Sequence, residues 1–350
     1  MRTETKRSIL VLIAPATLAA LVLALPVPSA SHLTTQAVDL HEYGFPAMSE
    51  DVLSSVFYIS NERIAVFFDQ LLPEQSPHDH ALKLMVFDTE EGHAASQLVV
   101  HADPRAVDIT AGPGGGVLLG REGKLSFYDS NLQLLKSVPL AQGTAGIKFD
   151  RRLNQLVVET VDETSGLRTA HFKDGNSLKE SAALSYPIKS QGVFGKDELA
   201  YAISGNCKGA AHVISNRVRW RGLDQLPACD PLAFIEEDSL AYASDGHLYA
   251  IDSKADQRLD LRIPAPDTFE MPRFIGLSDD HVRFALSAQR REKLSSRWPY
   301  HNDVFVYDLA SKHMIFEHTL KKGSVAMALS PGGRQMVTIE GGELMLLSVP

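Results

Sequence analysis

The stretch Ser330–Val349, SPGGRQMVTIEGGELMLLSV, decides the fold. It opens with a turn cluster, Pro331-Gly332-Gly333, and continues into a short β-rich run from Gln335 to Ile339. Gly341-Gly342 then stands where a tight hairpin needs positive backbone φ, and a second apolar run follows it. The stretch therefore predicts a turn, a strand, a hairpin turn and a second strand.

Fainter copies of this unit recur along the chain. A strand that ends in an aromatic or aliphatic residue followed by aspartate occurs four times, at Asp88, Asp129, Asp252 and Asp308. The successive spacings are 41, 123 and 56 residues, which fit one period, three periods, and one period with an insertion of 15. A period of about 40 residues with four strands per unit is typical of a β-propeller blade.

This register predicts an all-β, seven-bladed β-propeller. The blades are expected over residues 52–101, 106–140, 146–184, 188–223, 232–263, 274–320 and 325–349. The seventh has room for only three strands, and an open ring would expose an unpaired sheet edge. Thr34–Leu40 (TTQAVDL) has the residue types of a strand, so we expect this N-terminal strand to join the last blade beside Leu344–Val349 and close the ring. A disordered tail is the alternative.

The SPGGRQMVTIEGGELMLLSV unit resembles the repeat of YVTN-type and related WD-like bacterial β-propellers. Their common form is Ser-Pro-Asp-Gly-Arg, an apolar strand, a glycine turn and a second strand, and Gly332 stands here in place of the usual aspartate. Ser278-Asp279-Asp280 and Phe149-Asp150-Arg151-Arg152 are degraded versions of the turn. The resemblance covers residues 31–350 by period and about one blade by motif. It implies an architecture that is often found in exported proteins, without a single activity.

Residues 1–30 differ in composition from the rest. Arg2, Lys6 and Arg7 make a basic start, Ile9–Leu25 is almost wholly apolar, and small or helix-breaking residues follow. This order predicts a cleaved secretory signal peptide, and hence one propeller domain over residues 31–350 in the periplasm or outside the cell. The alternative is an uncleaved membrane anchor, because the apolar run is long for a signal.

The charge of the chain argues against a nucleic-acid partner. The formal net charge is −9, and it becomes −11 without residues 1–30. No stripe of Lys and Arg remains that could follow a phosphate backbone. No other apolar run is long enough to cross a bilayer, so we expect membrane contact only through an uncleaved signal segment.

Cys207 and Cys229 are the two cysteines of the chain. In an exported protein such a pair predicts one disulfide, and two free thiols are the alternative. Both are expected in loops on the same face of the disc, which makes a bond between them geometrically sensible. Metal binding by the pair alone is disfavoured because neither belongs to a CxxC element.

A long connection in the first blade, Gln70–Ala81, contains His78 and His80. It falls on the face where the connections between blades also lie, and propellers often bind ligands there. Two imidazoles two residues apart in an extended chain point the same way and could chelate zinc or copper with a third ligand. A divalent metal site is therefore one interpretation and a solvated polar loop the other. No other cofactor is expected.

The insertion in the sixth blade, Ser287–Asp303, concentrates cations and aromatic rings in an otherwise acidic protein. Arginine beside aromatic residues suits recognition of a carboxylate, a sugar or an anionic peptide, through bidentate hydrogen bonds and stacking. The alternative is an exposed loop whose aromatic residues pack on the neighbouring blade. The candidate ligand-binding residues are Arg290, Arg291, Arg297, Trp298, Tyr300 and His301.

These features favour a secreted or periplasmic module that binds or scaffolds a protein, peptide or carbohydrate ligand. The alternative is a propeller enzyme, such as a lyase or a metal-assisted hydrolase, with its site at the mouth of the central channel. The sequence assigns no catalytic residue, and it contains neither a Gly-x-Ser-x-Gly elbow nor an HExxH helix. The channel discriminates between the two: converging His, Asp, Glu and Arg favour an enzyme, and apolar side chains favour a scaffold.

Overall fold

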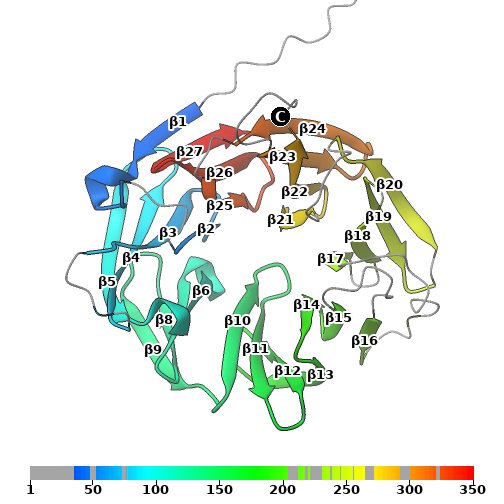
Figure 1. Cartoon of the computed structure of the whole chain (residues 1–350), viewed down its shortest axis with the longest axis horizontal. Coiled ribbons are helices and arrows are strands. Elements are labelled where there is room, and N and C mark those ends of the chain that lie inside the picture. Colours follow the sequence, from blue (N-terminus) through cyan, green and yellow to red (C-terminus); the bar gives the residue numbers. More distant parts are fainter. Residues whose placement is uncertain are drawn as a thin grey trace, which may run out of the picture. The chain divides into compact units, whose positions relative to one another are not determined.

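A computed structural model describes residues 35–47, 53–72, 76, 78–203, 212–216, 220, 231–236, 239–244, 246–254, 256–264, 272–291, 300–320 and 324–350. These residues form seven antiparallel sheets and three short 3-10 helices (Figure 1). The predicted all-β, seven-bladed propeller is confirmed. The predicted signal peptide over 1–30 and both cysteines, Cys207 and Cys229, lie outside the described residues.

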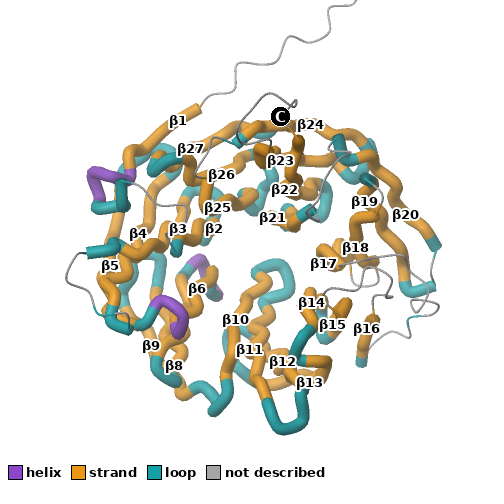
Figure 2. Tube along the Cα trace, in the orientation of Figure 1, coloured by secondary structure: helices purple, strands orange, loops and turns teal. Residues whose placement is uncertain are grey.

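Each blade is a meander whose first strand lies at the channel and whose last strand lies at the rim (Figure 2). The first three blades are β2 (Ser54–Tyr58), β3 (Arg63–Asp69), β4 (His80–Asp88) and β5 (Ala94–Ala102); β6 (Val107–Ala111), β7 (Val117–Arg121), β8 (Lys124–Tyr128) and β9 (Leu134–Pro139); and β10 (Thr144–Asp150), β11 (Gln155–Asp162), β12 (Leu167–Asp174) and β13 (Glu180–Pro187).

The remaining blades follow in chain order. They are β14 (Ser190–Gly195), β15 (Glu198–Ile203) and β16 (His212–Ser215); β17 (Pro231–Glu236), β18 (Ser239–Ser244), β19 (His247–Asp252) and β20 (Gln257–Arg262); β21 (Arg273–Leu277), β22 (Arg283–Arg291), β23 (Tyr300–Asp308) and β24 (His313–Thr319); and β25 (Ser324–Leu329), β26 (Gln335–Glu340) and β27 (Glu343–Ser348) with β1 (Thr35–Asp39). The 3-10 helices are η1 (Leu40–Tyr43), η2 (Pro104–Ala106) and η3 (Pro113–Gly115). Among the described residues no helix is long and apolar enough to cross a membrane.

The N-terminal segment is part of the seventh blade. β1 pairs antiparallel with β27, with Thr35 opposite Leu347 and Asp39 opposite Glu343. The chain then turns inward through η1, and the fully buried Leu40 and the largely buried Phe45 enter the core between the seventh and first blades. This segment therefore supplies both the outer strand of the last blade and part of the adjoining core.

The hydrophobic core consists of separate clusters, each lying between two successive blades. The central strands bury both of their faces and so read as nearly continuous apolar runs. In β3, for example, all six residues from Ile64 to Asp69 are buried. Because every blade needs a neighbour on each side, the core is complete only in a closed ring.

The sequence predicts a loop for the sixth-blade insertion, but the structure shows strands at both of its ends. Ser287–Arg291 belongs to β22 and Tyr300–Asp303 belongs to β23, and Arg290 pairs with His301. The longer hairpin satisfies backbone N–H and C=O groups that a loop would leave to solvent.

The repeated aspartate has a structural reason, because it closes the turn between the third and fourth strands of a blade. Asp88 Oδ1 accepts the backbone N–H groups of Glu90 and Glu91 at 2.9 and 3.2 Å. Asp308 Oδ1 likewise accepts the N–H of Ser311 at 2.7 Å. An ionised aspartate favours such a turn because its oxygens stand in for backbone acceptors.

These turns predict a loss of stability in acid. The backbone hydrogen bonds hold the pKa of Asp88 and of Asp308 below the ordinary value of 3.8. A carboxyl with a lowered folded-state pKa contributes stability above its unfolded pKa and loses it as the pH falls further. We expect the urea midpoint to fall as the pH drops below about 4. The urea midpoint of Asp308→Asn should fall less steeply with pH than that of the parent protein. Identical pH profiles for the parent and this variant would contradict the explanation.

Candidate functional site

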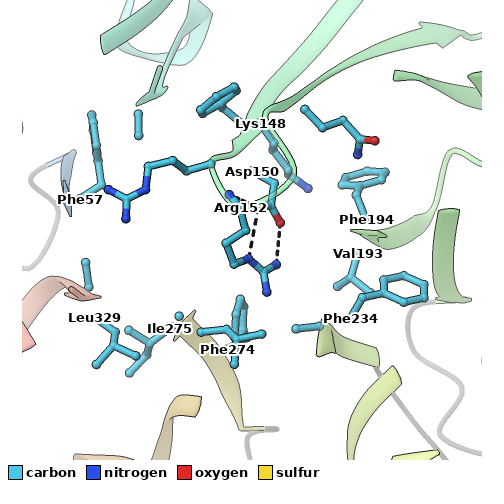
Figure 3. A pocket seen from close by; sticks show the side chains of 18 of the residues that line it. Phe57, Lys148, Asp150, Arg152, Val193, Phe194, Phe234, Phe274, Ile275 and Leu329 are labelled. Carbon is cyan, nitrogen blue, oxygen red and sulfur yellow. Dashed lines mark hydrogen bonds and ion pairs between the residues drawn. The ribbon is translucent and has the colours of Figure 1, made fainter. Parts of the chain in front are cut away.

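A cavity of about 460 Å³ lies inside the ring (Figure 3). The inner strands of all seven blades, β2, β6, β10, β14, β17, β21 and β25, contribute residues to its wall. The chain places these residues together because each blade starts at the channel, so equivalent positions of successive repeats meet around one axis. Its volume lies within the ordinary range of ligand pockets.

Most of the wall is apolar. Five phenylalanines from five different blades line it, and Phe274 keeps 37% of its surface exposed. Aliphatic residues such as Val193, Ile275 and Leu329 complete this part of the surface (Figure 3). Aromatic side chains offer large apolar contact areas to a ligand. The five rings are Phe57, Phe149, Phe194, Phe234 and Phe274.

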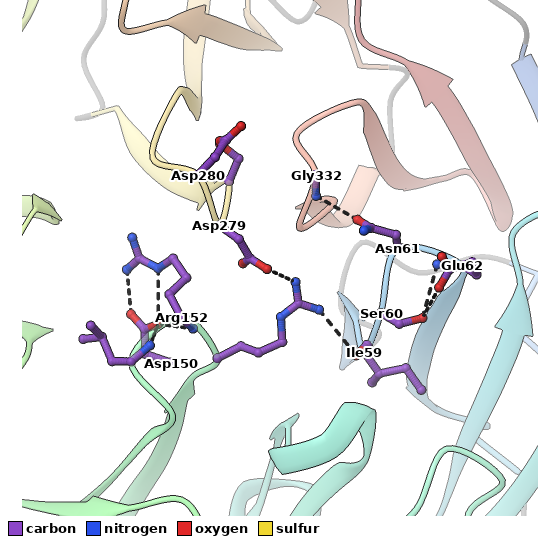
Figure 4. Close-up of polar contacts among 12 residues, drawn as sticks. Ile59, Ser60, Asn61, Glu62, Asp150, Arg152, Asp279, Asp280 and Gly332 are labelled. Carbon is purple, nitrogen blue, oxygen red and sulfur yellow. Dashed lines mark hydrogen bonds and ion pairs between the residues drawn. The ribbon is translucent and has the colours of Figure 1, made fainter.

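Two arginines of the wall are held by aspartates. Arg152 donates two hydrogen bonds to Asp150, from Nε to Oδ1 at 3.2 Å and from Nη2 to Oδ2 at 2.6 Å. Arg151 Nη2 reaches Asp279 of the sixth blade at 2.5 Å, and its Nη1 lies 3.5 Å from the carbonyl oxygen of Ile59 in the first blade (Figure 4). Arg151 thereby links three blades at this end of the channel.

The turn of the opening sequence stretch lies at the same end. Asn61 Oδ1 accepts the N–H of Gly332 at 2.8 Å (Figure 4). Asp279 donates its N–H to the carbonyl oxygen of Pro331 at 2.8 Å. Gly333 adopts φ = +68°, a conformation that glycine enters at little cost. The Ser-Pro-Gly-Gly turn and its two degraded copies are thus joined through Asp279, which contacts Pro331 and Arg151.

A charged network extends outward from the cavity through the third blade. Lys148 Nζ lies 3.5 Å from Glu159 Oε2 and 4.5 Å from the ring centroid of Phe194. The buried Glu159 also accepts hydrogen bonds from Arg168, at 3.3 Å, and from the Tyr186 hydroxyl. Burial, and then the hydrogen bond to Glu159, raise the pKa of Tyr186 well above its usual value, so its hydroxyl stays a donor.

Asp108, on the inner strand of the second blade, stands near this network. Burial raises its pKa, the negative charge of Glu159 raises it further, and the positive charge of Lys148 opposes both. Asp108 is not among the residues that line the cavity.

The structure does not bring the predicted histidines together. His78 lies in a turn before β4, where the alternation of an extended strand does not hold, and its Nδ1 lies 2.8 Å from Asp103 Oδ2. His80 is already in β4, and its Nδ1 bonds Asp69. Among the described residues no three His, Cys, Asp or Glu side chains are grouped to hold a metal ion. The divalent metal stays a prediction.

The structure does not describe the side chains of the six candidate ligand-binding residues in the sixth blade. Arg297 and Trp298 lie outside the described residues. The backbones of Arg290 and Arg291 end β22, and those of Tyr300 and His301 begin β23, but their side chains are not described.

Reasoning from sequence missed the cavity wall. Lys148 and Phe274 carry no local motif, and they line one cavity only because β10 of the third blade and β21 of the sixth are both inner strands. The repeat pattern is the feature of the sequence that could have identified these cavity residues. Reading the same inner-strand positions of every blade side by side would have collected most of the five phenylalanines.

Comparison with known proteins gives the fold. No protein-family model and no curated protein matches the chain. A chain of the crystal structure of the Mitotic Checkpoint Complex is 14% identical, with 90% of this chain and 91% of that chain covered and a TM-score of 0.54. KlHsv2 with loop 6CD replaced by a Gly-Ser linker is 14% identical over 83% and 90%, with a TM-score of 0.51. The C-terminal WD40 domain of Sif2 is 10% identical over 87% and 94%, with a TM-score of 0.45. The first two likenesses, at 14% identity, show the fold alone and agree with the seven antiparallel sheets: the chain is an all-β, seven-bladed propeller.

Proposed function

We propose that this protein is a binding module and that the channel cavity holds a side chain or a chain end of a protein or peptide ligand. One observation carries the proposal: inner strands from all seven blades supply the cavity wall, which is mainly aromatic and aliphatic. Apolar pockets with a few placed polar groups are typical of binding sites.

The alternative of an enzyme receives less support from the same wall. Its two aspartates, Asp150 and Asp279, are each held by an arginine. Among the described residues that line the cavity there is no His, Cys, Ser or Thr, and the other groups that could act as a nucleophile or a proton carrier are Lys148, which pairs with Glu159, and the buried Tyr58. A catalytic site combines several such groups around a substrate, and this wall offers few.

The apolar wall of the cavity favours a protein or peptide partner over a carbohydrate. Sugars need several polar side chains around them, whereas this wall suits the apolar side chains of a protein. The likeness to a chain of the Mitotic Checkpoint Complex, an assembly of proteins, adds fold-level analogy only.

We also propose that the protein works after export, in the periplasm or outside the cell. The composition of residues 1–30 and the resemblance of 330–349 to YVTN-type repeats support this location. In that compartment Cys207 and Cys229 would form a disulfide. The sixth-blade segment from Arg290 to His301 is a second candidate contact surface.

Site-specific photocrosslinking tests the proposed function. A benzophenone amino acid replaces Phe274 at the cavity, or Leu135 on the outer strand β9, where 66% of the side chain is exposed. Each protein is produced in the organism that encodes it and irradiated in intact cells. We expect a discrete protein adduct from position 274 and none from position 135. No adduct from 274, or the same adducts from both, would contradict the proposal.

A further inference from the structure

The cavity wall carries one positive charge in excess. Its charged residues are three cations, Lys148, Arg151 and Arg152, and two carboxylates, Asp150 and Asp279. Each arginine holds one of these aspartates. Lys148 is different, because its carboxylate partner Glu159 does not line the cavity. This excess stands out in a chain with a net charge of −9.

Glu159 cannot fully neutralise Lys148. Its side chain is 3% exposed, and its single negative charge faces Lys148 at 3.5 Å and Arg168 at 3.3 Å. Asp108 is the other carboxyl near this network, and burial and the charge of Glu159 both raise its pKa, which disfavours its negative form. Two cations around the Glu159 carboxylate therefore favour a net positive charge here. The Lys148 side chain is 55% exposed, so an anion entering from the cavity can approach its ammonium group.

The Lys148 ammonium group is also held in position. Glu159 Oε2 and the carbonyl oxygen of Gly192 each lie 3.5 Å from its nitrogen. The centroid of the Phe194 ring lies 4.5 Å away (Figure 3). The Tyr186 hydroxyl and Arg168 in turn fix Glu159. A lysine that is already ordered loses less conformational freedom on binding an anion than a mobile surface lysine does.

We propose that the cavity takes the carboxyl-terminal residue of a peptide or protein, with an apolar side chain among the phenylalanines and the terminal carboxylate on Lys148. This inference rests on the proposed function and names its ligand class. A chain end is the occupant that brings one carboxylate and one apolar side chain to the same residue. The remainder of the ligand would leave past Phe274, which is 37% exposed.

Dye displacement tests this inference on the full protein. The neutral dye N-phenyl-1-naphthylamine reports occupancy of the apolar cavity without itself needing a cation. N-acetyl-phenylalanine, which mimics a C-terminal residue, competes with the dye, and so does its amide, which lacks the charge. We expect the acid to displace the dye at about tenfold lower concentration than the amide, as a charge-assisted hydrogen bond implies.

Three lysine variants show whether Lys148 causes the preference for the acid over the amide. Lys148→Met should abolish the preference for the acid, and Lys148→Arg should retain most of it. Lys136→Met is the matched control, because Lys136 also lies over a phenylalanine ring, that of Phe127 at 4.4 Å, but on the outer strand β9. This control should leave the preference unchanged.

The outcomes separate the two proposals. Equal displacement by acid and amide, or an acid preference that survives in Lys148→Met, would overturn the chain-end inference and leave the apolar binding site standing. Tighter competition by 3-phenylpropionate than by N-acetyl-phenylalanine would reassign the site to small aromatic acids. If the dye does not bind saturably, or binds equally well to Phe274→Ala, the proposed function fails with the inference.

Discussion

Leu40→Ala is expected to lower the free energy of unfolding by about 2–5 kcal/mol, the usual cost of truncating a buried leucine. Leu40 is 0% exposed and packs in the cluster between the seventh and first blades. Its backbone N–H also donates to the carbonyl oxygen of Gly342 at 2.9 Å. The substitution therefore leaves a cavity at the point where the N-terminal segment completes the ring.

Urea unfolding followed by circular dichroism measures this effect. Leu135→Ala is the control, because this leucine is 66% exposed and its truncation should change stability by less than about 0.5 kcal/mol. If the N-terminal segment closes the ring, only the Leu40 variant should lose stability. Equal midpoints for the two variants would mean that β1 and η1 do not contribute to the folded core.

Glu159→Ala is expected to destabilise the protein by about 3 kcal/mol, because it breaks a buried charge network. The change leaves the Tyr186 hydroxyl without its acceptor and places Lys148 and Arg168 near each other with no carboxylate between them. Glu159→Gln should cost less, since the amide oxygen still accepts a hydrogen bond.

The control for this network is Glu180→Ala. Glu180 is 45% exposed and pairs only with His171 among the ion pairs of the described residues, at 3.1 Å. An exposed pair of this kind contributes about 0–1 kcal/mol. The same urea series should rank Glu159→Ala as the least stable, Glu159→Gln next and Glu180→Ala closest to the parent. A loss in Glu159→Ala no larger than in Glu180→Ala would show that the network is not structural.

The fold was predictable because local and repeated signals agree. The glycines of Ser330–Val349 specify turns, and Gly333, Gly341 and Gly342 all have positive φ. The recurring aspartate specifies the turn after the third strand, and the observed hydrogen bonds of Asp88 and Asp308 explain why. Both signals depend on a few neighbouring residues, so the sequence displays them directly.

The candidate site was not predictable in the same way. Whether His78 and His80 share a direction depends on where β4 starts. The strand begins at His80, so His78 lies outside it and pairs with Asp103, whereas His80 pairs with Asp69. In the sequence, Phe149-Asp150-Arg151-Arg152 shows only the pattern of a degraded turn. Its contact with Asp279 depends on the closed ring, which sets distances between blades that are far apart in sequence.

The most direct test of the channel as a binding site is a crystal structure of the full protein with N-acetyl-phenylalanine. We expect the phenyl ring to lie among Phe194, Phe234 and Phe274, and the carboxylate to lie within hydrogen-bond distance of Lys148 Nζ. A ligand bound between outer strands, or one whose carboxylate points away from Lys148 into solvent, would contradict it.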